Sequence, residues 1–151
     1  MRVRLAVLLL FAALSPRIHA HGDEYFDSRP APHGGQVRMA GPIHLELVVR
    51  SGDVTVYVTD HTDNRVNTDN GSAKVIIRAS KKNRFVVVLR PAGDNVLRGA
   101  GEFKLGKRND VTVLVTLPGQ DAQRAQFKIG KDGKPIAAAK RRAGSARHSA
   151  R

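Results

Sequence analysis

Apolar and polar residues alternate in repeated short stretches of this chain, and the pattern is clearest over residues 43–61. Apolar side chains occupy every second position before and after a break, at Ile43, Leu45, Leu47, Val49, Val54, Val56 and Val58. A period of two with many β-branched residues predicts strands. The intervening Ser51-Gly52-Asp53 supplies turn residues, because glycine tolerates positive φ and Ser and Asp bond the local backbone. We therefore predict a β-hairpin that ends at Asp60 and His61.

The same alternation recurs further along the chain, separated by residues typical of turns. It predicts strands near residues 36–39, 72–79, 84–90 and 111–117, a weaker strand pair within 96–105, and a last strand around 125–129. No pattern outside the first twenty residues favours a helix. The sequence thus predicts an all-β fold, an antiparallel immunoglobulin-like β-sandwich of about 7–9 short strands.

The first twenty residues have the composition of a secretory signal peptide. A short basic start is followed by an apolar run that stops at Ser15-Pro16-Arg17, well before the roughly 20 apolar residues that a membrane span needs. Ile18-His19-Ala20 resembles a small-residue cleavage site. We predict export to the periplasm with cleavage after Ala20, so that the mature chain begins with His21.

Four segments follow from these patterns. We predict a signal peptide at residues 1–20, an extended N-terminal arm at 21–35, the β-sandwich domain at 36–130, and a disordered basic tail at 131–151. The arm is polar and proline-rich, but Tyr25 and Phe26 are able to pin it onto a sheet.

The chain is strongly basic, with 26 Lys and Arg against 13 Asp and Glu. Such a balance often indicates nucleic acid as a partner, but the predicted export argues against one. Several of the basic groups fall in the low-complexity tail, namely Lys140, Arg141, Arg142, Arg147 and Arg151. We expect this tail to touch anionic components of the cell envelope.

The candidate chemistry of the chain rests on histidine, because cysteine is absent and thiolate metal sites are therefore excluded. At a mature N-terminus, His21 would offer a free amine beside its imidazole, and the two groups can chelate one ion. Nitrogen-rich sites suit Cu(II), and Zn(II) or Ni(II) less well. We predict a metal site formed by His21, His33, His61 and Asp60, provided that the arm folds to the end of the hairpin.

Alternatives to this ligand set remain open. If His33 and His61 lie at opposite ends of the domain, the expected ligands are His21 with a carboxylate of the arm, Asp23 or Glu24. Met39 is expected in the core. His44 and Glu46 alternate with the apolar residues of the hairpin, so we expect them on a solvent-exposed face.

Two resemblances bear on this prediction. An amino-terminal histidine on a small exported β-domain resembles the copper-resistance C family of periplasmic copper carriers, whose Asp-X-His spacing is replaced here by adjacent Asp60 and His61. The body is similar to a small periplasmic β-domain family of proteobacterial heavy-metal efflux, found near or within adaptor proteins of the cobalt-zinc-cadmium type. The similarity covers roughly residues 31–117 and is carried by the runs PHGGQ, HLELV, VTVYVTDH, GSAKV and PAGDNVLRGAGEF.

The resemblance of the body implies metal homeostasis in the periplasm, with His33 and His61 as candidate ligands and an efflux adaptor as a partner. The sequence therefore favours a periplasmic metal-binding accessory protein. The alternative is a metal-free envelope β-module that binds an anionic partner or another protein through its surface and basic tail. No nucleophile or metalloprotease motif is present, so we predict that the protein is not an enzyme.

Overall fold

The computed structural model describes residues 21–136, which form one short helix and eight strands. The elements are α1 (His21–Asp27), β1 (Gln36–Ala40), β2 (Ile43–Arg50), β3 (Asp53–Asp60), β4 (Ser72–Arg78), β5 (Arg84–Pro91), β6 (Val96–Ala100), β7 (Arg108–Thr116) and β8 (Gln123–Gly130). The hairpin predicted over residues 43–61 is present as β2 and β3, paired along their whole length from Ile43–Asp60 to Arg50–Asp53.

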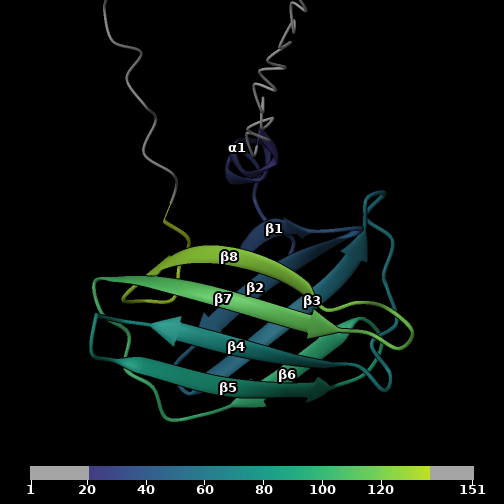
Figure 1. Cartoon of the computed structure of the whole chain (residues 1–151). Coiled ribbons are helices and arrows are strands. Elements are labelled where there is room, and N and C mark those ends of the chain that lie inside the picture. Colours follow the sequence, from purple (N-terminus) through teal and green to yellow (C-terminus); the bar gives the residue numbers. More distant parts are fainter. Residues whose placement is uncertain (1–20, 137–151) are drawn as a thin grey trace, which may run out of the picture.

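All strands are antiparallel and follow the order β1-β2-β3-β6-β5-β4-β7-β8 in one sheet. The sheet curls until its two edge strands, β1 and β8, come close together (Figure 1). The all-β, antiparallel class is therefore confirmed, in the form of a nearly closed, barrel-like sheet.

The core fills the inside of this curled sheet with the alternating apolar residues of the strands. From β2 and β3 it takes Ile43, Leu45, Leu47, Val49, Val54, Val56 and Val58, and from the opposite strands Val75, Ile77, Leu89, Val113 and Phe127, among others. Because successive side chains of a strand point to opposite faces, the residues between them face outward. Met39 is one of these, and at 45% exposure it does not have the core position expected for it.

Two contacts hold the curl. The side-chain oxygen of Gln36 on β1 accepts a hydrogen bond of 2.9 Å from the backbone N–H of Lys128 on β8, across the seam between the edge strands. On the other side, β5 and β6 pair through only Arg90–Arg98 and Pro91–Leu97. There Gly99 lies against β5 so closely that a Cβ atom would stand 2.4 Å from the Val88 carbonyl oxygen.

The ends of the described chain differ from the sequence expectation. Residues 21–27 form helix α1 rather than an extended arm. Residues 131–136, expected in the tail, turn back onto β8, with the Ile136 N–H donating to the Lys128 carbonyl at 2.8 Å. The predicted signal peptide at 1–20 and the part of the predicted tail from 137 onward lie outside the described residues. Between residues 96 and 105 only one strand forms, β6, instead of a pair.

Helix α1 lies against edge strand β1 at the seam (Figure 1). Arg38 of β1 shares its face with the buried Ala40, but at the edge its guanidinium reaches the carboxylates of α1, at 2.8 Å from Asp27 and 3.5 Å from Asp23. In the described part of the chain, no helix is long and apolar enough to cross a membrane.

We predict that Gln36→Ala lowers the free energy of unfolding by about 1–2 kcal/mol, because it leaves the N–H of Lys128 without its partner at a buried seam. Urea unfolding monitored by circular dichroism measures the change. Gln126→Ala, an exposed glutamine on the same β8 strand, is the matched control and should change stability by less than about 0.5 kcal/mol. Equal effects of the two substitutions would contradict the seam contact.

Candidate histidine site under the N-terminal arm

The N-terminal arm covers the outer face of β2 and β3 and encloses a cavity of about 310 Å³ there. Three histidines line it, together with Phe26, Glu46 and Tyr57: His33 from the arm, His44 from β2 and His61 from the loop after β3. His33 and His61 therefore line the same cavity, which the sequence left undecided. The cover also buries His44 and Glu46, at 8% and 5% exposure, so the expectation that they face solvent is wrong.

Glu46 anchors the arm to the sheet. Its Oε1 accepts hydrogen bonds from the backbone N–H groups of His33 at 2.8 Å and Gly35 at 3.0 Å, and its Oε2 lies 2.7 Å from the His33 Nδ1. A buried carboxylate is costly unless its oxygens are paired. The three donors supply this pairing and fix the course of residues 33–35.

Two contacts hold the ring of His33. Its ring stacks on Tyr57 with the planes 1° apart and the centroids separated by 3.6 Å, while Nδ1 is held by Glu46. Since Tyr57 is the cross-strand partner of Glu46, one pair of neighbouring residues on β2 and β3 fixes both the plane and the position of the imidazole. The Nε2 atom is left for a ligand.

His44 and His61 form a second, separate arrangement. The His61 Nδ1 lies 3.2 Å from the His44 Nε2, and the rings meet at 75°. Phe26 of α1 packs its ring against the other side of His44, at 4.9 Å between centroids. The arm thus shields one histidine of the pair, whereas His61 remains exposed.

The opposite nitrogen of His44 faces a carboxylate. Its Nδ1 is buried without a hydrogen bond to any described residue, and the Asp63 Oδ1 lies 3.6 Å away. An anion at this place favours the proton on Nδ1, because a bare lone pair there would face another acceptor. The lone pair of Nε2 then points toward His61, where it can accept a proton or bind a metal ion.

The loop that carries His61 and Asp63 is organised by Asp60. The Asp60 carboxylate accepts hydrogen bonds from the backbone N–H and the hydroxyl of Thr62, both at 2.8 Å, and from the N–H and side-chain amide of Asn64 at 3.0 and 3.2 Å. These bonds, above all that of the Thr62 hydroxyl, lower the pKa of Asp60 to about 2. Asp63 adopts φ 63°, and the chain then runs back along β3, where Arg65 forms an antiparallel bridge with Thr59.

The four residues predicted as metal ligands lie in different parts of the structure. Only the backbone of His21 is described; it begins α1, five residues before Phe26, or about 7.5 Å along the helix axis. His33 and His61 line one cavity, whereas the Asp60 carboxylate accepts hydrogen bonds within its own loop. Within residues 21–136, no group of three or more His, Asp or Glu side chains converges as a complete metal site.

Two residues of the site escaped the sequence reasoning, His44 and Asp63. The alternation placed His44 correctly on the outer face of the hairpin, but nothing in the strand pattern shows that the arm covers that face. A usable signal was the cross-strand register: once Ile43 pairs with Asp60, His44 and His61 must lie near the same hairpin end.

No model of a known protein family matches this chain, and no curated protein matches its sequence.

We predict that Glu46→Ala frees the arm from the sheet. Loss of a buried acceptor that serves three donors should raise the hydrogen-exchange rates of the His33 and Gly35 amides at least about tenfold, while the amides of β4 and β7 keep their protection. Glu102→Ala, an exposed carboxylate that accepts no hydrogen bond from a described residue, is the control. Unchanged exchange at both amides would mean that Glu46 does not hold the arm.

We also predict an acid-sensitive loop at residues 60–64. The pKa of Asp60 is lowered from 3.8 to about 2 in the folded protein, so the hydrogen bonds of its anion contribute stability above about pH 4 and are lost as the pH falls toward 2. Exchange of the Thr62 and Asn64 amides should accelerate over this interval beyond the intrinsic pH effect, and Asp60→Asn should remove that pH dependence. Asp121→Asn, at a carboxylate that accepts no hydrogen bond from a described residue, should leave it intact.

Proposed function

We propose that the protein is a periplasmic metal-binding accessory protein of heavy-metal homeostasis or efflux, and that the His44–His61 pair is the centre of its metal site. The observation that carries the proposal is the distance of 3.2 Å between the His44 Nε2 and the His61 Nδ1. Two nitrogens bound to one ion at about 2.0–2.1 Å each are about 2.9–3.4 Å apart at square-planar and tetrahedral angles. The pair therefore needs little movement to accept an ion.

Asp63 supports this role through the other ring nitrogen of His44, Nδ1. A carboxylate facing the far nitrogen of a ligating histidine fixes its tautomer and raises its basicity, and the 3.6 Å separation from His44 Nδ1 can close by a small movement of the exposed Asp63 side chain. The unpaired, buried Nδ1 of His44 gains its partner in this way.

The remaining ligand positions would come from the arm or from water. His21 starts the same helix that places Phe26 on His44, so cleavage after Ala20 would give this helix a free amine at its first residue. Nitrogen donors of this kind favour Cu(II) over Zn(II) or Ni(II). His33, with Nδ1 bound to Glu46 and Nε2 unengaged, is a further ligand candidate on the same cavity.

In this role the protein is exported with cleavage after Ala20, binds metal rather than catalysing a reaction, and has an efflux adaptor as its partner. The immunoglobulin-like assignment is retained as the finer description of the barrel-like, all-β fold. The resemblance and the histidine pair share His61, and the pair adds His44, which was not among the ligands predicted from the sequence.

We predict that the correctly processed protein binds one Cu(II) ion and that His61→Gln weakens binding at least about tenfold, because it removes one of two ligands of the pair. Asp63→Asn should weaken binding about tenfold by releasing His44 Nδ1. Isothermal titration with Cu(II), Zn(II) and Ni(II) in a weakly competing buffer measures these affinities. His148→Gln, a histidine of the tail, is the control and should bind as the unaltered protein does.

Two further samples separate the possible ligand sets. One extra residue before His21 removes the chelating terminus, and His33→Gln removes the imidazole held by Glu46. If affinity falls only in the first sample, and His61→Gln binds the ion as tightly as the unaltered protein, the terminus holds the ion and the His44–His61 site is contradicted. Equal affinity in every sample would favour the metal-free envelope module instead.

A further inference from the structure

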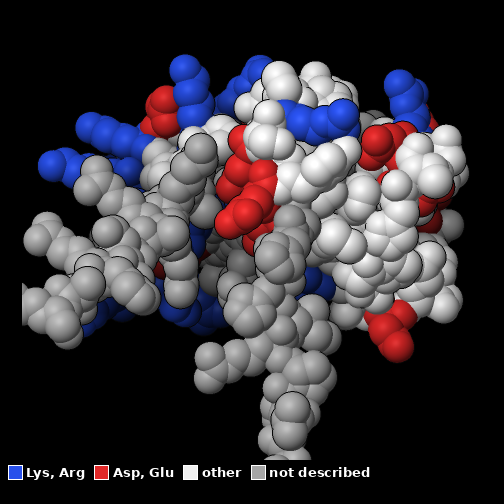
Figure 2. Space-filling model, turned by 90° about the horizontal axis from the view of Figure 1, so that it is seen from above, with Lys and Arg blue, Asp and Glu red and all other residues white. Residues whose placement is uncertain are grey.

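The outer face of β5, β4, β7 and β8 is strongly cationic. The strand register places its outward residues in rows, Arg84-Arg78-Asp110-Lys128 and Val88-Lys74-Leu114-Arg124, with Val86-Ile76-Thr112-Gln126 between them. Arg90 follows on β5, so six exposed cations face one carboxylate, Asp110, on this part of the sheet. Lys and Arg side chains also project on several sides of the view in Figure 2.

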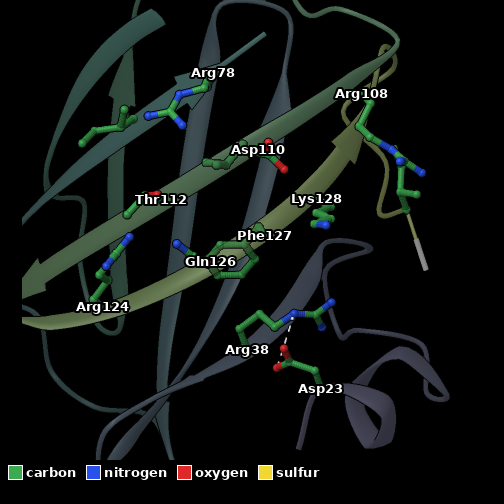
Figure 3. A pocket seen from close by; sticks show the side chains of 13 residues that line it. Asp23, Arg38, Arg78, Arg108, Asp110, Thr112, Arg124, Gln126, Phe127 and Lys128 are labelled. Carbon is green, nitrogen blue, oxygen red and sulfur yellow. Dashed lines mark ion pairs between the residues drawn. The ribbon is translucent and has the colours of Figure 1, made fainter. Parts of the chain in front are cut away.

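This face becomes hollow where it meets α1. A depression of about 740 Å³ is lined by Arg78 from β4, Asp110 from β7 and Arg124 and Lys128 from β8, with Arg108 and the Arg38–Asp23 ion pair at its border (Figure 3). Unlike Arg38, the side chains of Arg78, Arg108, Arg124 and Lys128 form no ion pair with a described residue. Like charges so placed repel each other, and an anion in the hollow relieves this repulsion.

Apolar side chains lie among these cations instead of in the core. Val86 and Val88 on β5 are 51% and 54% exposed, and they are cross-strand neighbours of Ile76 and Lys74 on β4. These two exposed apolar side chains lie on one face of β5, with Arg84 and Arg90 near the two ends of the strand. A partner with both negative charge and apolar surface would satisfy both features.

We propose that this face docks the folded domain on an anionic phospholipid surface. Headgroup phosphates would pair with Arg78, Arg124 and Lys128, and the two valines would contact the boundary between headgroups and acyl chains. A polysaccharide or nucleic acid fits less well, because no exposed aromatic ring lies on these four strands to stack on a sugar or base. The inference is independent of the metal site, which lies on β2 and β3.

The test is co-sedimentation with phosphatidylcholine vesicles that contain about one third phosphatidylglycerol, with the basic tail intact in every sample. The triple variant Arg78→Gln, Arg124→Gln, Lys128→Gln should partition at least about tenfold less, since each surface cation strengthens binding roughly fivefold at low salt. The control triple variant Arg50→Gln, Lys104→Gln, Lys131→Gln removes the same charge from exposed sites outside the four strands and should lose less than about threefold.

A second pair of measurements separates a lipid surface from a soluble anion. Val86→Ser with Val88→Ser should reduce vesicle binding about threefold and leave binding to inorganic polyphosphate unchanged. The proposal is overturned if both triple variants lose binding equally, which would assign it to net charge and the tail. It is also overturned if the unaltered protein binds polyphosphate but not the vesicles, or if the valine substitutions leave vesicle binding unaltered.

Discussion

The buried carboxylate of Glu46 is the constraint on which the described site depends. It lies on the outer face of β2, where an uncovered carboxylate would be hydrated and an unpaired buried one would be costly. The arm resolves this by bringing two backbone N–H groups and the His33 ring to its two oxygens. With residues 33–35 fixed there, the preceding residues cross the same face, and the Phe26 ring packs against His44. A cavity with three histidines follows from one anchored side chain.

A second carboxylate has the corresponding role on the other side of the cavity. Asp60 ends β3 and uses its oxygens on Thr62 and Asn64, so the loop turns tightly and presents His61 and Asp63 to His44. Asp60 was predicted as a metal ligand, and its observed bonds indicate a different way of serving the same site. By holding the loop it orients His61 and Asp63, which in the proposed metal site would be one ligand and the carboxylate facing the other ligand, His44.

The strands and the core were predictable because period-two alternation is a local property of the sequence. The hairpin of β2 and β3, the inward residues of β4, β5, β7 and β8, and the all-β class all follow from it. The curl of the sheet was not predictable, because it depends on contacts between residues far apart, such as Gln36 with Lys128. Helix α1 was missed for a related reason: its seven residues are too few to show a helical period, and tertiary contacts of Asp27 and Phe26 hold them.

The site was only half predictable, and the missing half is informative. His33 and His61 were singled out in the sequence and share the cavity, but His44 was taken for a solvated residue because alternation distinguishes inside from outside only for a sheet without a cover. On β5, in contrast to β2, the outward positions remain exposed. Val86 and Val88 occupy outward positions as apolar residues, and no described segment covers them. Where the pattern and the burial disagree on β2, the protein supplies its own cover, the arm. On β5 no described segment supplies a cover, and the proposed cover is an anionic membrane surface, so the two outer faces of this sheet are expected to serve different partners.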